Sequence, residues 1–447
     1  MGRLHLLSSL MTPGHFRTAW RLPHADPTAY LDIDHFQRLA RIADEVGLDA
    51  VFLGDGPALR GEIATAPGTG IDPLVLLGNL AAITERVGVL VTSSTTYNSP
   101  YNLARRFQAL DIVTNGRAAV NIVTTHAPAA AANFGLVQHP PKEERYRRAH
   151  EFLDVVTRLW DGWEPGAVVA DKDTGVYADV TRIHPVDHHG EFFSVAGPLP
   201  VPAGPQGRPV VVQAGGSEGG LRLAGDFADA VFTVAQTKAK AVAFRDDIRS
   251  RAAAAGRRPD DVKISLGVVV LVAATEQEAL RRADELYATL PIDSLTASLA
   301  VALGLPDGAY APDHVVRLED VPDAPPGELR SAGFQVSTRA LLAEGPQTLR
   351  ELVHRGAGGS GHRLLVGSAE QVADDLEDWF RAGAADGFTV MPADTSVDFE
   401  AFARLVVPIL VERGLFEPAL VGSTLRERLG LHSVERAPGD ASVRSLA

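Results

Sequence analysis

The chain has 447 residues, of which 45% are apolar and 22% charged, a composition typical of a globular protein with a large core. Its formal net charge of -14 repels phosphates and anionic lipids, so we expect no nucleic-acid or membrane partner. The absence of cysteine excludes disulfides, thiolate catalysis, iron–sulfur clusters and cysteine-based zinc sites. Because no signal-peptide pattern and no membrane-length apolar stretch occurs, the sequence predicts a cytoplasmic protein.

Short apolar, β-branched segments alternate with segments of helical period along most of the chain. In its first part the pattern predicts strands at residues 4–8, 50–55, 87–91 and 118–124, and helices at 34–46, 73–85, 101–114 and 143–161. Residues 162–208 interrupt this alternation with charged, His-containing and then Pro-rich sequence. We expect an inserted hairpin and an extended loop there.

The alternation resumes after this insertion. It predicts strands at 209–213, 229–234, 262–273, 363–366 and 387–391, and helices at 217–227, 238–255, 276–288, 369–382 and 398–413. About eight strands in this register favour a closed α/β barrel, the (β/α)8 TIM barrel, over an open doubly wound sheet. We therefore predict one barrel domain over 1–431, with insertions near 162–208 and 290–345, and a disordered tail over 432–447.

Polar residues stand where the predicted strands end, which in a TIM barrel is the catalytic face. Asp55 either projects from the rim towards a ligand or caps a turn or helix. The hydroxyls of Thr92 to Thr96 either bind a heteroaromatic ring edge or phosphate, or form a polar turn. Asn121 interrupts an apolar strand, and its amide offers a donor and an acceptor to a ring with alternating acceptor and donor atoms; a satisfied core Asn is the alternative.

The segment Gln213 to Gly220 is rich in glycine and lies between a strand and a helix. Glycines allow close backbone approach, Ser217 can cap the helix, and free N–H groups at the helix start would face a phosphate. An ordinary glycine-rich turn is the alternative. The spacing matches neither the dinucleotide-binding nor the P-loop pattern.

Two other kinds of site receive little support. His184, His188 and His189 cluster in the first insertion without a helical metal-binding spacing, so exposed hairpin histidines are favoured over a metal site. No GxSxG nucleophile elbow supports a serine hydrolase.

Taken together, these residues and their neighbours resemble the bacterial luciferase-like, FMN-dependent monooxygenases, and more narrowly the nitrilotriacetate, EDTA and dibenzothiophene-sulfone monooxygenase branch. The likeness covers nearly the whole chain, and the segments that carry it are Gly14–Arg21, Phe52–Asp55, Thr95–Phe107, Leu110–Arg117, Asn121–Thr125, Glu144–Tyr146, Gln213–Ser217, Ala384–Pro392 and Arg413–Phe416.

The resemblance implies an enzyme that takes FMNH2 from a separate NAD(P)H-dependent flavin reductase and uses O2 to oxygenate a small organic substrate. It also implies a homo-oligomer. The residues that match the flavin positions of the family are Asp55, Thr92, Asn121, Thr125, Tyr146 and Ser217. Asp55 and Asn121 would lie near the isoalloxazine, and Tyr146 and Ser217 at the phosphate. Lys142 stands where the family often has His, which leaves its contact with the phosphate open.

His15 and His126 are candidates for acid or base in the oxygen-transfer step, because both are expected near the barrel mouth. The reaction requires a dry site, so the two insertions are candidates for a covering lid. Two alternatives remain open: a deazaflavin-dependent oxidoreductase of the same superfamily, and a barrel that binds flavin without catalysis.

Overall fold

The computed structural model describes residues 2–59, 61–68, 70–306, 308–322, 338–339, 341–343, 345–357 and 361–432. Except for His432, the predicted tail lies outside these residues.

Eight parallel strands form a closed ring, which confirms the predicted TIM barrel. Each strand hydrogen-bonds to the next, and the last, β13, pairs with the first, β1. Around the ring the strands are β1 (His5–Ser9), β2 (Ala50–Leu53), β3 (Gly88–Ser94), β4 (Ala118–Val123), β7 (Val210–Ala214), β8 (Ala230–Thr233), β9 (Lys263–Ala273) and β13 (Gly387–Pro392).

One predicted strand lies outside the ring. The first residues of the long strand β9 pair with the short strand β8, which leaves the edge of its second half free. Strand β12 (Arg363–Ser368) pairs with that edge, from Val268 to Ala273. β12 is therefore a ninth strand that extends the barrel wall at its C-terminal end.

Strand β3 also differs from its prediction, because it continues through Ser94 rather than ending at residue 91. Its pairing with β4 extends to Ser94 and Val123, so Thr92 and Ser94 belong to the strand. Both side chains are buried.

The helices surround the barrel and bury one apolar face each against it, as their period predicts. They are α1 (Ile33–Glu45), α2 (Pro73–Ala81), α3 (Pro100–Val113), α4 (Lys142–Asp161), α5 (Glu218–Phe227), α6 (Lys238–Ala254), α7 (Glu276–Tyr287) and α11 (Ala369–Arg381). The predicted helix 398–413 is divided into α12 (Asp398–Ala401), a π-helical turn (Phe402–Val406) and α13 (Val407–Glu412). Pro408 has no N–H to donate, which accounts for the irregular turn before it.

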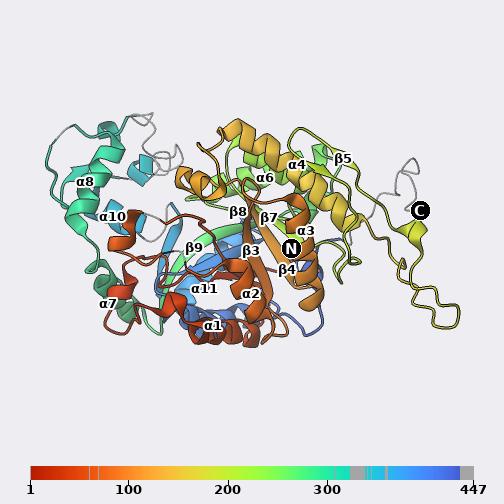
Figure 1. Cartoon of the computed structure of the whole chain (residues 1–447). Coiled ribbons are helices and arrows are strands. Elements are labelled where there is room, and N and C mark those ends of the chain that lie inside the picture. The colour runs from red at the N-terminus through yellow and green to blue at the C-terminus, as the bar shows by residue number, and fades with distance from the viewer. Residues whose placement is uncertain are drawn as a thin grey trace.

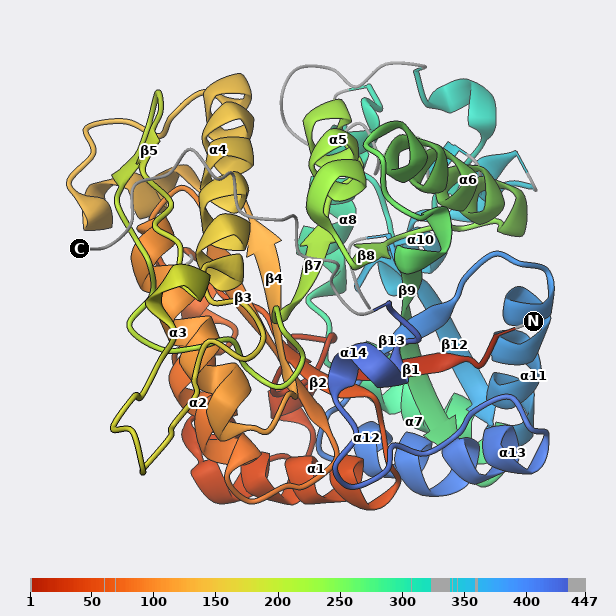
Figure 2. The ribbon, with the colours of Figure 1, turned by 90° about the vertical axis from the view of Figure 1, so that its right-hand side faces the viewer.

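The N-terminal end of the barrel is closed by the short helix α14 (Leu425–Arg428) (Figure 2). Leu425 and Leu429 pack on inward-facing residues of the barrel, among them Leu90 and Val212. In the described part of the chain, the barrel interior is therefore closed at its N-terminal end.

The two insertions lie in different places. The first carries the expected hairpin, β5 (His188–His189) with β6 (Ser194–Val195). Glu151 of α4 holds it through His188 and the backbone N–H groups of Phe192 and Phe193, so the hairpin packs against α4. The second contributes α8 (Ile292–Leu303) and α10 (Leu349–Ala357), which form a lobe at one side of the molecule (Figure 1).

No single helix of the described residues is long and apolar enough to cross a membrane. Helices α7 and α8 pass that test only as a pair, by length and composition, and they are bent by 84° relative to each other.

Candidate functional site

An amide and a hydroxyl meet inside the barrel, near the C-terminal ends of β3 and β4. Thr92 and Asn121 are register partners, and Asn121 Nδ2 donates to Thr92 Oγ1 at 3.0 Å. Asn121 Oδ1 is buried and has no hydrogen-bond partner. A buried acceptor left unpaired is costly, so this position is suited to a ligand that donates a hydrogen bond.

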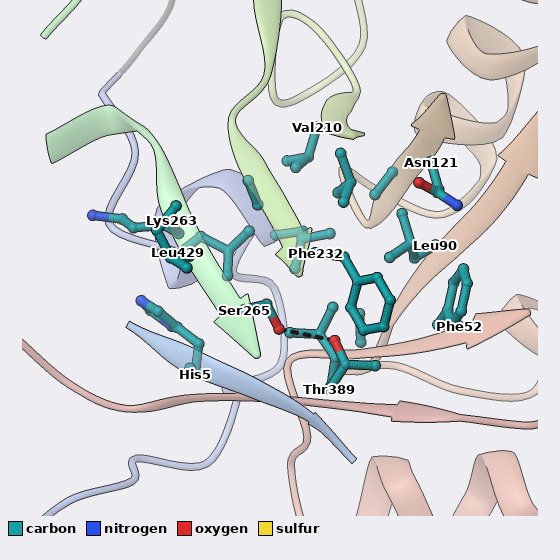
Figure 3. Close-up of a pocket in the computed structure, with 18 residues that line it drawn as sticks. His5, Phe52, Leu90, Asn121, Val210, Phe232, Lys263, Ser265, Thr389 and Leu429 are labelled. Carbon is teal, nitrogen blue, oxygen red and sulfur yellow. Dashed lines mark hydrogen bonds between the residues drawn. The ribbon is translucent and has the colours of Figure 1, made fainter. Parts of the chain in front are cut away.

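Below Asn121 the barrel interior is nearly filled. The remaining cavity measures about 40 Å³ and is lined mainly by apolar side chains, with Phe52 and Phe232 on one side (Figure 3). The two phenyl rings lie 6.4 Å apart, and the hydroxyls of Ser265 and Thr389 hydrogen-bond to each other at 2.8 Å. A space of this size admits no more than one or a few water molecules, so an organic ligand does not fit inside the barrel below Asn121.

A second polar group lies at the start of α5. Ser217 is the N-cap residue, and its side chain does not cap the helix but donates to the Tyr146 hydroxyl at 2.9 Å. Gly219 faces the Tyr146 ring, where a Cβ would lie 2.7 Å from Cγ. Gln213 Oε1 is buried without a partner. The hydroxyls of Tyr146 and Ser217, together with the N-terminus of α5 and its glycine backbone next to the Tyr146 ring, form a suitable binding site for a phosphate.

Thr125 joins β4 to helix α4. It adopts a left-handed backbone conformation with φ of 42°, and its hydroxyl donates to Ser94 Oγ at 2.7 Å. Arg145, buried at the start of α4, donates to the Thr125 carbonyl at 2.7 Å and also to His139 Nε2. Ser94 belongs to the run of hydroxyls from Thr92 to Thr96 that the sequence singled out, whereas Arg145 and His139 received no role, although Arg145 stands beside Tyr146 in a motif that carried the resemblance.

Two histidines lie close together at the other side of the mouth. Gly14 allows the chain to pass the β13 loop, because a Cβ there would lie 2.2 Å from the Ala393 carbonyl oxygen. His15 follows, and its backbone N–H donates to Pro392 O. Burial, with a smaller effect of the nearby His362, lowers the pKa of His15 to about 3. His15 is therefore neutral at physiological pH, and its Nε2 has no partner.

His362 was missed by sequence analysis. It precedes β12, and its ring lies 5.4 Å from that of Phe232 and close against Gly267. Burial lowers the pKa of His362 to about 4, against a smaller opposing effect of a backbone hydrogen bond with Gly267. His362 reaches the mouth because the strand that follows it, β12, pairs with β9 outside the ring of eight strands. This pairing is a tertiary contact, so no sequence pattern indicated that His362 lies there.

The remaining predicted residues lie at the rim. Asp55 follows β2, His126 follows β4 and Lys142 is the first residue of α4, and all three side chains are exposed. The structure thus joins Thr92 to Asn121 and Tyr146 to Ser217 by hydrogen bonds, while no hydrogen bond among the described residues links Asp55, His126 or Lys142 to them. In that part of the chain no group of three or more His, Asp or Glu residues could hold a metal ion.

The chain is similar to known proteins in both sequence and structure. The sequence matches the luciferase-like monooxygenase family over residues 14–386. It is 40% identical to nitrilotriacetate monooxygenase component A of Aminobacter aminovorans, covering 92% of this chain and 93% of the relative. It is 37% identical to N-acetyl-S-(2-succino)cysteine monooxygenase of Bacillus subtilis, covering 94% of each. The structure of EDTA monooxygenase from Chelativorans sp. BNC1 aligns with a TM-score of 0.82 at 34% identity, over 97% of this chain and 99% of that one.

Proposed function

The chain belongs to the luciferase-like monooxygenase family, and from this premise we propose that it binds reduced FMN at the barrel mouth and oxygenates a small organic substrate. The predicted family and the enzyme class, an FMNH2-dependent monooxygenase of the two-component type, are confirmed by these relatives. The placement of the flavin on named residues is our proposal.

The donors and acceptors at the mouth fit FMN. Tyr146 and Ser217, with the N-terminus of α5, would hold the phosphate, while Asn121 and Thr92 would face the ring. Thr125 and Asp55 would complete the rim. Bound FMNH2 supplies two electrons, so that one atom of O2 enters the substrate and the other leaves as water.

His15 and His126 lie in different environments, and the roles we propose for them differ accordingly. His15 is neutral and its burial disfavours protonation, so it would accept a hydrogen bond with Nε2 rather than act as a cationic acid. His126 is exposed, and would exchange protons between the site and solvent.

The partners follow from the same proposal. An NAD(P)H-dependent flavin reductase would supply FMNH2, and both proteins would work in the cytoplasm. We also propose that the chain forms a homo-oligomer.

The observation that carries the proposal is the buried, unpartnered Asn121 Oδ1 at the mouth. We expect Asn121→Leu to weaken anaerobic FMNH2 binding about tenfold or more, since loss of a buried hydrogen bond of this kind amounts to about 1.5 kcal/mol. Titration followed by flavin absorbance measures this. The matched control Asn79→Leu changes an exposed residue of α2 and should retain wild-type affinity.

The alternatives give different results in one experiment. The chain is loaded anaerobically with FMNH2 or with a reduced deazaflavin and then mixed with O2. Slow reoxidation of bound FMNH2, with less H2O2 released when substrate is present, supports the monooxygenase. Turnover only with the deazaflavin would support the hydride-transfer alternative, and binding without any turnover would support a non-catalytic barrel.

A further inference from the structure

A larger cavity, of about 490 Å³, lies between β12 and the lobe of α8 and α10. Its apolar wall includes Leu299 of α8, Leu352 of α10 and Val366 of β12. His362 also lines it, and His362 packs on Phe232 and Gly267 of the barrel. The cavity therefore adjoins the barrel mouth.

The polar side chains on this wall are mostly neutral. Tyr287 lines the cavity, and the His354 ring stacks on it with centroids 3.9 Å apart and planes at 7°. Burial lowers the pKa of His354, as it lowers that of His362, so neither contributes a positive charge at neutral pH.

Two arginines line the cavity, and their environments differ. Arg363 is paired with Asp375 at 2.8 Å and lies over the Trp379 ring, so its charge is balanced. Arg355 on α10 is exposed, and no carboxylate of the described residues lies within 4 Å of its guanidinium. Glu351, one turn earlier, accepts hydrogen bonds from the backbone N–H and hydroxyl of Thr348 instead. Arg355 thus carries a positive charge that forms no salt bridge with the described residues, although Glu351 and Tyr287 are close enough to interact with it electrostatically.

We propose that this cavity is the substrate chamber and that it accepts an amphipathic organic anion. The anionic group binds Arg355, and the apolar body lies against the leucines and valine of the wall. The His362 ring lines the end of the cavity that packs against Phe232 and Gly267 of the barrel. The term substrate rests on the proposed function, whereas the binding chemistry rests on the cavity alone.

Octanoate and octanamide test the proposal, because they share an eight-carbon chain and differ in charge. Isothermal titration calorimetry on the full chain, without flavin, measures both affinities. We expect octanoate to bind at least tenfold more tightly than octanamide. In Arg355→Gln this preference should fall to about twofold or less, while octanamide affinity stays unchanged.

The matched control is Arg350→Gln, on the same helix, where the guanidinium pairs with exposed Asp313 outside the cavity. It should retain the preference for octanoate. Equal affinities in the wild type, or an unchanged preference in Arg355→Gln, would overturn the proposal. If FMNH2 fails to bind while the preference for octanoate persists, the proposed function is wrong and the anion site stands.

Discussion

Single residues at the mouth are fixed by very close contacts. Tyr146 can approach the start of α5 only because residue 219 has no side chain, and Ser217 then reaches the Tyr146 hydroxyl. His15 likewise depends on Gly14, whose φ of 145° and close approach to Ala393 leave no room for a Cβ. The geometry of the site therefore depends on glycines as much as on the polar residues.

Gly219→Ala tests the first of these contacts. The added methyl would lie 2.7 Å from the Tyr146 ring, so the ring must move and its hydrogen bond with Ser217 is lost. We expect FMNH2 affinity to fall about tenfold, which corresponds to about 1.4 kcal/mol. The control Gly78→Ala in α2 meets only Leu110, at 3.9 Å, and should bind like the wild type. Unchanged affinity in Gly219→Ala would show that Tyr146 does not hold the phosphate.

His362 predicts a pH dependence of stability. Its folded pKa of about 4 lies below the usual value of 6.5, so the unfolded chain binds more protons between these pH values. Its contribution is therefore a loss of stability as the pH falls from 6.5 towards 4. Asp111 and Asp398, whose pKa values burial raises to about 6, act in the opposite direction.

Replacing His362 separates its contribution to the pH dependence from those of Asp111 and Asp398. In His362→Asn we expect the loss of unfolding free energy between pH 7 and pH 5 to be smaller than in the wild type by up to about 2 kcal/mol. Urea unfolding at the two pH values measures it. His189→Asn, in the exposed hairpin, should behave like the wild type. An identical pH dependence in His362→Asn would contradict a buried neutral His362.

At the scale of elements, short segments decide which end of the barrel is open. Helix α14 has only four residues, and a capping box between Thr424 and Glu427 begins it. Leu425 in this helix and Leu429 directly after it nevertheless fill the N-terminal end of the barrel. Strand β12 acts at the other end, where it extends the wall beyond β8 and carries His362.

Leu429→Ala should therefore destabilise the whole barrel. Leu429 is 5% exposed and packs among barrel residues, so we expect a loss of about 2–4 kcal/mol of unfolding free energy from the removed contacts and the cavity left behind. Urea unfolding at pH 7 measures it. Leu420→Ala, at a residue that is 66% exposed, should change stability by less than about 0.5 kcal/mol. Similar values for the two variants would argue against α14 as a structural cap.

At the scale of the whole molecule, we expect the two ends of the barrel to serve stability and ligand binding separately. At the N-terminal end, Arg426 of α14 donates to both oxygens of Asp229, at 3.2 and 2.9 Å. Burial alone would raise the pKa of Asp229, but Arg426 and Arg257 hold it below its usual value. Two buried side-chain atoms of the candidate site that have no partner among the described residues, Asn121 Oδ1 and His15 Nε2, lie towards the C-terminal end.

Asp229→Asn and Asn121→Leu should therefore each weaken a different property, stability in the first variant and FMNH2 affinity in the second. Asp229→Asn leaves Arg426 buried without its counter-ion, and we expect a loss of about 3–5 kcal/mol of stability with FMNH2 affinity unchanged. Asn121→Leu should weaken FMNH2 binding without a loss of stability. Unfolding and flavin titration on both variants check this, and a parallel loss of both properties in Asp229→Asn would contradict the division.

The sequence by itself determined the barrel, because the alternation of strand and helix periods is local and repeated. It also predicted Thr92, Asn121 and Ser217 as site residues from their places at strand and helix ends, and Tyr146 from the resemblance to the family. The partners within each pair became visible only in the tertiary structure, since Tyr146 and Ser217 are 71 residues apart and meet through the curvature of the barrel. The extra strand β12, the charge of Arg355 in a cavity and the neutral state of His362 were likewise decided by packing. Burial and pairing between distant segments set them, and neither leaves a periodic trace in the sequence.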